Sequence, residues 1–271
     1  MLISPLPNLE AWTAHFASTD IPVLRSTAAG LDALRPREDS VSAKVLADVM
    51  LADPLATARL FAFMAGRRSS RQVTEITSIE GCIVMLGVPP FLEAFRDPVM
   101  VEQGLLGRPD GLRGLIRVIR RSRRAARFAW QFGVWRQDPG VGEITIAALL
   151  HDIAEALIWA TAPDLALKIK AMQRADPGLR SRIAQKMVLN VEIEALQLAL
   201  ARQWRLPEFF VTMMDPQQAR NARVRNALYA VNLARHSATG WDNAALPDDY
   251  RQIGELLNTS AEHVREMVES E

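Results

Sequence analysis

The chain has 271 residues, of which 49% are hydrophobic and 23% are charged, the balance of an ordinary folded protein with a sizeable core. Its formal net charge of +1 excludes a strong overall attraction to nucleic acid or to acidic membranes. The one cysteine, Cys82, excludes an intrachain disulfide and fits a reducing, cytoplasmic location. The start of the sequence does not have the pattern of a signal peptide, and no run approaches the ~18 apolar residues of a membrane span, so we expect no membrane segment.

Local sequence signals predict helices throughout the first half of the chain. Asp53 followed by Pro54 places a capping side chain directly before a proline at the first helical position. Thr77 and Glu80 have the spacing of a capping box, and the apolar residues behind them recur at helical intervals until Gly87. We therefore expect one helix to begin after Asp53 and another to end at Gly87.

The second half of the chain is also expected to be helical. A long helix is predicted from about Leu112 to Phe132, and the next, from about Ile144 to Ala160, is apolar almost all round and is expected to be the central buried helix. A last helix is predicted to start after Ser260. Further helices are predicted between these, at Asp164–Ala175, Leu179–Met187, Asn190–Trp204, Pro207–Met214 and Ala222–His236. Because no alternation typical of strands is present, the predicted fold class is all-α.

Four stretches of the sequence, in this order and at this spacing, resemble the HDOD family of HD-related output domains. They are a helix, Asp-Pro and helix segment, an amphipathic helix ending in Leu-Gly, a buried helix with a His-Asp pair, and a Trp-x-Leu-Pro junction, at Leu46–Leu60, Ile76–Gly87, Ala147–Glu155 and Gln203–Pro207. The similarity runs from about Asp20 to the C-terminus, which is most of the chain.

The resemblance implies a domain organisation and a role. Residues 1–19 are expected to be an N-terminal extension, and residues 20–271 an HDOD domain. Within it, an N-terminal helical lobe (20–108) is expected to pack on a C-terminal helical lobe of the HD-superfamily type (109–271). The role implied is bacterial signal transduction by a regulatory, protein-binding module.

The metal centre of catalytic HD relatives is expected to be degenerate in this chain. The resemblance implies a metal held by an upstream histidine, an adjacent His-Asp pair and a downstream aspartate, because an ion that activates water needs several fixed ligands. The pair is present as His151 and Asp152. The upstream histidine falls on Arg117 or Arg121 and the downstream aspartate on Asn232, and the only other histidines are His15, His236 and His263. We therefore expect neither a metal nor another cofactor, and no catalytic residue.

Three roles are considered for the remaining pair. The favoured one is structural, with His151 and Asp152 as buried polar side chains that bond to neighbouring helices. A residual metal site completed by Glu155 or Asp215 is the second, since residues four apart share a helix face. Contact with an unknown ligand is the third.

A row of arginines along one helix face is the strongest signal outside the family motifs. Its members recur at intervals of three and four residues: Arg113, Arg117, Arg120, Arg124 and Arg127. The favoured interpretation is an ordinary solvated face neutralised by acidic residues of a neighbouring segment. The alternative is a binding patch for an anion or an acidic partner, because guanidinium groups match phosphate and carboxylate oxygens. The Arg67–Arg71 segment could extend this patch, but a connector is the favoured interpretation.

These observations favour a non-catalytic module that binds a signalling protein or a small anionic ligand. One alternative is a metal-dependent HD-type phosphohydrolase acting on nucleotides or cyclic dinucleotides. Nucleic-acid binding through the arginine row is another, and it is less favoured because the row lacks interleaved exposed aromatic residues and a known reader motif. Cys82 is expected to be a core thiol, and the tryptophans are expected to serve packing.

Overall fold

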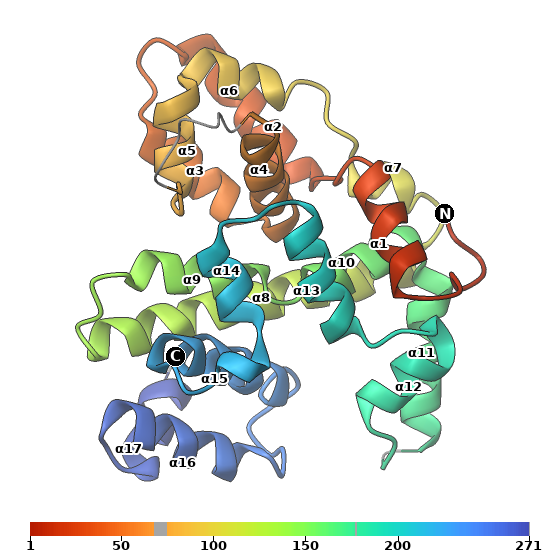
Figure 1. Cartoon of the computed structure of the whole chain (residues 1–271), viewed down its shortest axis with the longest axis vertical. Helices are drawn as coiled ribbons and strands as arrows, with labels where there is room; N and C mark the ends of the chain where they lie inside the picture. Colours follow the sequence, from red (N-terminus) through yellow and green to blue (C-terminus); the bar gives the residue numbers. More distant parts are fainter. Residues whose placement is uncertain (68–74, 177, 271) are drawn as a thin grey trace. The chain divides into compact units, whose positions relative to one another are not determined.

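Helices make up the architecture of this chain, as the sequence predicts. A computed structural model describes residues 1–67, 75–176 and 178–270, and these contain no β-strand, only an isolated parallel bridge between Val23 and Met100 (Figure 1). The helices form two compact units: residues 1–119 with 152–207, and residues 120–151 with 208–271. The boundary predicted at residues 108 and 109 stays a prediction. None of the helices in the described part combines the length and the apolar character needed to cross a bilayer.

The first unit contains most of the helices and the beginning of the long helix α8. In chain order its elements are α1 (Leu9–Ser18), α2 (Arg25–Leu34), the 3-10 turn η1 (Arg35–Arg37), α3 (Ala43–Leu51), α4 (Pro54–Arg67), α5 (Ile79–Leu86), α6 (Val88–Ala94), α7 (Val101–Gly104), α8 (Pro109–Trp135, up to Ile119), α10 (Ile153–Thr161), α11 (Pro163–Ala175), α12 (Ser181–Leu189) and α13 (Ile193–Gln203).

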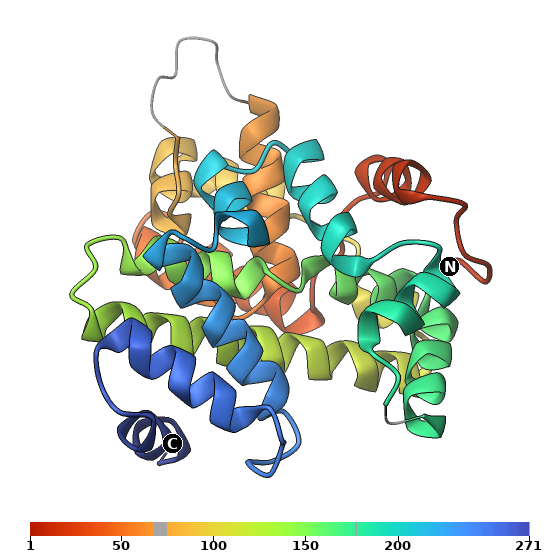
Figure 2. The ribbon, with the colours of Figure 1, turned by 60° about the horizontal axis from the view of Figure 1, so that its bottom comes forward.

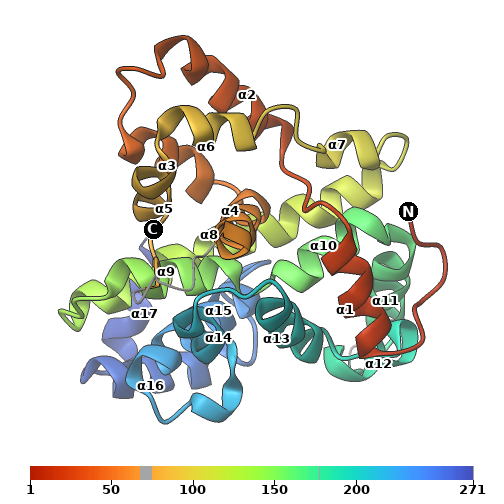
Figure 3. The same ribbon diagram turned by 45° about the horizontal axis from the view of Figure 1, so that its top comes forward.

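Helix α1, which lies in the predicted N-terminal extension, is bound to the body of the first unit. It packs against α13, far away in the sequence (Figure 3). Its Trp12 is fully buried, and the indole Nε1 donates a hydrogen bond of 2.8 Å to the carbonyl of Leu189 at the end of α12. A buried indole of this size contributes a large apolar area while its one polar group is satisfied. Trp12, within the predicted N-terminal extension, is therefore part of this core.

Asp53 begins α4 and also fixes the segment before α2. Its carboxylate accepts hydrogen bonds from the backbone N–H of Leu24 (2.8 Å), the hydroxyl of Thr27 (2.9 Å) and the backbone N–H of Leu55 (2.9 Å). The side chain is fully buried. Burial raises the pKa of the Asp53 carboxyl above its usual value, and the hydrogen bonds from Leu24 and Thr27 oppose this rise. The predicted N-cap at Asp53 is confirmed.

Helix α5 starts one residue later than its capping-box spacing predicts. The N-cap is Ser78, whose hydroxyl accepts a hydrogen bond of 3.1 Å from the backbone N–H of Gly81. The expectation of a cap at Thr77 is therefore wrong, because a second hydroxyl in the next position makes the same bond. The helix ends at Gly87, which has a φ of +82°. Cys82 is buried in this helix, and burial raises the pKa of its thiol to about 12, which confirms a core thiol.

The second unit is built around α15. Its elements are the remainder of α8 from Arg120, α9 (Val141–Leu150), α14 (Glu208–Met214), the 3-10 turn η2 (Pro216–Gln218), α15 (Ala222–His236), α16 (Leu246–Leu257) and α17 (Ala261–Glu269). Helix α15 contacts α9, α14 and α16, and α16 in turn carries α17 (Figure 2). The start of α17 after the N-cap Ser260 agrees with the sequence prediction.

Asp138 organises the turn between α8 and α9. Its carboxylate accepts two hydrogen bonds from the guanidinium of Arg223, at 2.8 and 3.0 Å, and one of 2.9 Å from the backbone N–H of Gly140. The Arg136 guanidinium lies 3.8 Å away. Burial alone would raise the pKa of Asp138, but the Gly140 bond and the two arginines outweigh it, so the pKa lies below its usual value. The start of α15 is thereby tied to the end of α8.

Candidate functional site

The His-Asp pair lies where a helix is interrupted. The continuous helix expected from Ile144 to Ala160 is in fact two helices, α9 and α10, with His151 and Asp152 in the turn between them. His151 keeps a helical backbone, whereas Asp152 has φ −104° and ψ 20°. Both residues are buried, with 8% and 3% of their surface exposed. The prediction of one central helix is wrong, since apolar periodicity continues through a break of only two residues.

A glutamine from α13 takes the place of the missing cap on α10. The Asp152 side chain makes no capping bond to its helix, although aspartate is a favoured residue at this position. Instead, the Gln197 Oε1 atom accepts a hydrogen bond of 2.9 Å from the backbone N–H of Ala154. Gln197 is only 3% exposed. No local sequence pattern identifies Gln197, because its side chain accepts a hydrogen bond from a residue 43 positions away.

The three positions predicted to replace lost metal ligands have different surroundings. Arg117 is exposed on α8, whereas Arg121 and Asn232 are half-buried. An exposed guanidinium at Arg117 makes Arg121 the better match to a buried upstream ligand. The amide of Asn232 on α15 lacks the negative charge that a divalent ion requires.

The other three histidines are on different elements and have neighbours of their own. The His236 Nδ1 atom lies 2.6 Å from a carboxylate oxygen of Asp249. The rings of His263 and Trp135 are centred 5.3 Å apart, and His15 lies beside Phe16 on α1.

The residues present do not fit the metal of a catalytic HD centre. In the part of the chain that the structure describes, no three histidine, cysteine, aspartate or glutamate side chains are grouped so that they could hold an ion, so neither Glu155 nor Asp215 completes such a group there. Two ligands alone do not hold a catalytic ion against water.

The arginine row includes side chains that are committed to contacts within the fold. Arg113 forms an ion pair with Asp110 of the same helix, at 2.5 Å. Arg124 donates a hydrogen bond of 2.7 Å to the carbonyl of Ser237, and its guanidinium lies 4.7 Å from the centre of the Trp241 ring. The Arg124 side chain therefore makes structural contacts within the second unit and is not part of an open patch.

The C-terminal half of α8 presents a different exposed face from the one predicted. Arg120 and Arg123 are exposed, and neither forms an ion pair with a described residue. Arg127 continues the same face, followed by Trp130 and Val134, which are 50% and 48% exposed. The five positions follow one another at intervals of three and four residues, so they share a side of the helix. Trp130 follows the predicted arginine row and is not interleaved with it, but its exposure shows that the expectation that the tryptophans serve packing is wrong for this residue.

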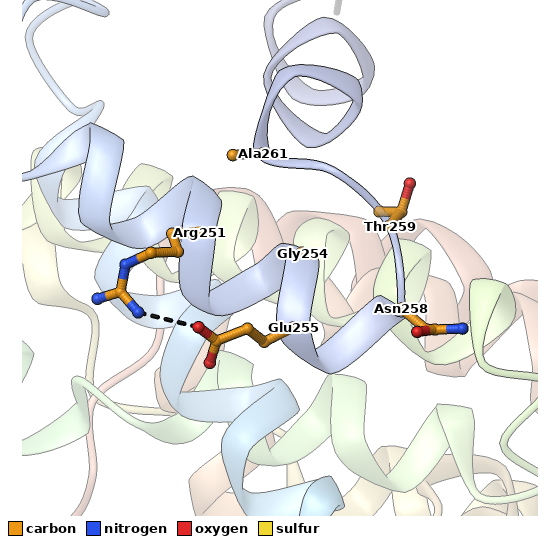
Figure 4. A pocket seen from close by; sticks show the side chains of 6 residues that line it. All are labelled: Arg251, Gly254, Glu255, Asn258, Thr259 and Ala261. Carbon is orange, nitrogen blue, oxygen red and sulfur yellow. Dashed lines mark hydrogen bonds and ion pairs between the residues drawn. The ribbon is translucent and has the colours of Figure 1, made fainter.

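A shallow hollow lies between α16 and α17 in the second unit (Figure 4). The cation at its edge is Arg251, whose guanidinium is held by Glu255 at 2.9 Å and by Asp248 at 3.3 Å. At Gly254 an added Cβ would lie 2.8 Å from the carbonyl oxygen of Thr259, so this glycine permits the close approach of the turn that follows. The close approach of the turn to α16 at Gly254 therefore accounts for the hollow.

The fold and the pair together define an HD-like helical protein. Among solved structures, the chain is similar to the MmoQ response regulator of Methylococcus capsulatus, with 18% identity, a TM-score of 0.66 and coverage of 93% of this chain and 99% of that one. It is equally similar to a virulence factor of Campylobacter jejuni, with 18% identity, a TM-score of 0.66 and coverage of 92% and 89%. An HDOD domain protein of unknown function from Geobacter sulfurreducens matches at 17% identity and a TM-score of 0.51, over 97% of this chain and 94% of that one. No curated protein matches the chain.

The family model of the HDOD domain matches residues 21–220. The chain belongs to the HDOD family, as the four sequence stretches predict.

Proposed function

We propose that this chain is a non-catalytic signal-transduction module of the bacterial cytoplasm, which acts by binding a partner protein and is regulated by a small ligand. The proposal rests on the incomplete set of metal ligands around the His-Asp pair. His151 and Asp152 sit in a buried turn, the other histidines have partners elsewhere, and a basic and an amide side chain stand at the positions of the missing ligands. The similarity to MmoQ, which is named a response regulator, agrees with a signalling role.

The surface proposed for the partner is the exposed face of α8 formed by Arg120, Arg123, Arg127, Trp130 and Val134, here called the α8 face. Three positive charges next to an exposed indole and a valine match an acidic protein segment that carries one large apolar side chain. Arginine and tryptophan are also the residues that dominate the binding energy of protein interfaces. A nucleic-acid backbone is disfavoured, because the formal charge of the whole chain is +1.

The absence of catalysis is tested by measuring metal content and hydrolysis on the purified chain. We expect no stoichiometric divalent metal after purification, and no phosphate release from nucleotides or cyclic dinucleotides when Mn²⁺ is added. A turnover that His151→Ala abolishes would overturn the proposal and restore the phosphohydrolase alternative.

The partner surface is tested by charge reversal at two exposed arginines. The double variant Arg120→Glu and Arg123→Glu should lose capture of an acidic partner from a bacterial lysate, and the affinity of the wild-type complex should fall as salt is raised. The matched control, Lys168→Glu with Arg220→Glu, makes the same change in net charge at other exposed positions. Equal capture by both double variants would show that the α8 face is not the surface.

A further inference from the structure

A cavity of about 460 Å³ opens in the first unit, and neither the His-Asp pair nor the α8 face contributes to its lining. Its walls come from the end of α1 and the turn after it, the middle and end of α4, the end of α6 and the end of α13. This volume lies within the range of about 300–1,000 Å³ that is typical of small-molecule sites.

Three aromatic side chains line this cavity. They are Phe63 of α4, Phe95 after α6 and Trp204 at the end of α13. Phe95 and Trp204 are buried, while Phe63 is half-buried. Aromatic surfaces of this kind favour a flat ring as the apolar part of a ligand.

Two arginines and one aspartate supply the charge of the cavity. The Arg59 guanidinium donates a hydrogen bond of 3.0 Å to the carbonyl of Ile21 and lies 3.8 Å from the carboxylate of Asp20. These contacts hold the side chain against the cavity wall, and a guanidinium has five N–H donors, so donors remain for a ligand. Arg205 lines the same cavity and forms no ion pair with a described residue. The described lining therefore carries one positive charge in excess.

The backbone conformation at position 205 gives no reason for an arginine there, so it indicates a role for the Arg205 side chain. Arg205 follows the last residues of α13 with a φ of +52°, a conformation that glycine adopts without strain. Its N–H donates to the carbonyl of Arg202, and the N–H of Leu206 donates to the carbonyl of Ala201, which is the Schellman motif of a helix end. Glycine would close the helix equally well, so the arginine accepts strain without any gain to the backbone.

We propose that this cavity binds a small anion joined to a flat ring, with Arg59 and Arg205 on the anionic group and Phe63 against the ring. A nucleoside monophosphate and an aromatic carboxylate both have this chemistry, and the single excess positive charge fits one anionic group. The inference deepens the proposed function, since it names the class of the regulatory ligand and rests on that function only for its biological meaning.

The test is calorimetric titration of the whole chain in EDTA with two probes, adenosine 5′-monophosphate and indole-3-acetate. At least one should bind with a dissociation constant below about 1 mM. Adenosine, or indole without its carboxylate, should bind at least about tenfold more weakly because the anionic group is missing. Binding of one probe and not the other would show which of these two anionic ligands the cavity accepts. No heat from either probe would overturn the proposal.

Arg205→Gly is the informative variant, since it removes the side chain and relieves the backbone. It should unfold at the same or a higher temperature than the wild type, and bind the probe at least about tenfold more weakly. Arg202→Ala is the matched control, because this exposed arginine lies three residues away and does not line the cavity. Unchanged binding by Arg205→Gly, or an equal loss in Arg202→Ala, would overturn the proposal. Because EDTA excludes metal-dependent turnover, this result is separate from the test for hydrolysis.

Discussion

Asp53 in the first unit and Asp138 in the second have similar structural roles, but their pKa values are shifted in opposite directions. Each accepts several hydrogen bonds and ties a helix start to a distant segment. Asp53 accepts hydrogen bonds from backbone N–H groups and a hydroxyl, whereas Asp138 accepts from the backbone N–H of Gly140 and from the Arg223 guanidinium, with the Arg136 guanidinium nearby. The pKa of Asp53 is raised, chiefly by burial, and that of Asp138 is lowered. At Asp53 deep burial outweighs the hydrogen bonds, whereas at the less buried Asp138 the Gly140 hydrogen bond and the two arginines together outweigh burial.

The largest effect is expected from Asp53→Ala. The substitution leaves the N–H groups of Leu24 and Leu55 and the hydroxyl of Thr27 without their acceptor in a buried place. We expect a loss of about 3 kcal/mol in the free energy of unfolding, measured by urea denaturation. Asp53→Asn retains one acceptor oxygen and should lose less. If the alanine and asparagine variants were equally stable, the carboxylate would not be the acceptor that matters.

Asp138→Ala should cost less, about 2 kcal/mol, in the same measurement. The variant leaves the Arg223 guanidinium and the N–H of Gly140 without their acceptor. Water can replace this acceptor at Arg223, because its side chain is one-third exposed. The control is Asp176→Ala, an exposed aspartate whose side chain accepts a local hydrogen bond from Gly178. A cost at Asp138 no greater than that at Asp176 would remove the role assigned to the ion pair.

The contributions of the two carboxylates to the free energy of unfolding should depend on pH in opposite directions. Asp138 has a lowered pKa when folded, so its stabilisation is present above the unfolded pKa of about 3.9 and is lost as the pH falls through the folded pKa. Asp53 has a raised pKa when folded, so its buried charge destabilises above that pKa, and this cost disappears as the pH falls toward about 3.9.

The measurement is the free energy of unfolding from pH 7 to pH 3, for the wild type, Asp138→Asn and Asp53→Asn. On acidification, the advantage of the wild type over Asp138→Asn should shrink below about pH 4, while its stability relative to Asp53→Asn should rise. Parallel curves for the two variants would contradict the difference in electrostatics.

The smallest effect concerns two neighbouring arginines of α8. Arg124→Ala loses the hydrogen bond to Ser237 and the contact with the Trp241 ring, so we expect a cost of about 1 kcal/mol. Arg123→Ala removes an exposed side chain and should change stability by less than about 0.5 kcal/mol. Thermal unfolding of both variants checks this difference, and equal shifts would show that Arg124 is as open as its neighbour.

The sequence is sufficient to predict features that depend on local signals. The all-α class, the cap at Asp53 and the helix that starts after Ser260 all follow from residues within a few positions of one another. The family likewise follows from short stretches in a fixed order. The position of the cap at α5 is wrong by one residue, because Thr77 and Ser78 are chemically equivalent at this level.

The features that sequence reasoning missed all depend on distant contacts. The turn at His151 and Asp152 is supported by Gln197, and the periodicity of apolar residues carries no trace of that bond. The exposure of Trp130 depends on which helix faces are covered by others. The cavity at Arg205 is lined by four segments that are far apart in the chain, so no local sequence pattern predicts it.

The burial of Cys82 has a practical consequence for labelling. It is the only thiol of the chain, it is fully covered, and with a pKa of about 12 it holds almost no thiolate at neutral pH. A maleimide dye should therefore leave the native protein unmodified, so that a cysteine introduced at Arg123 receives the only fluorophore. Its emission anisotropy would then report directly on whatever docks there, with no need to replace the native cysteine first.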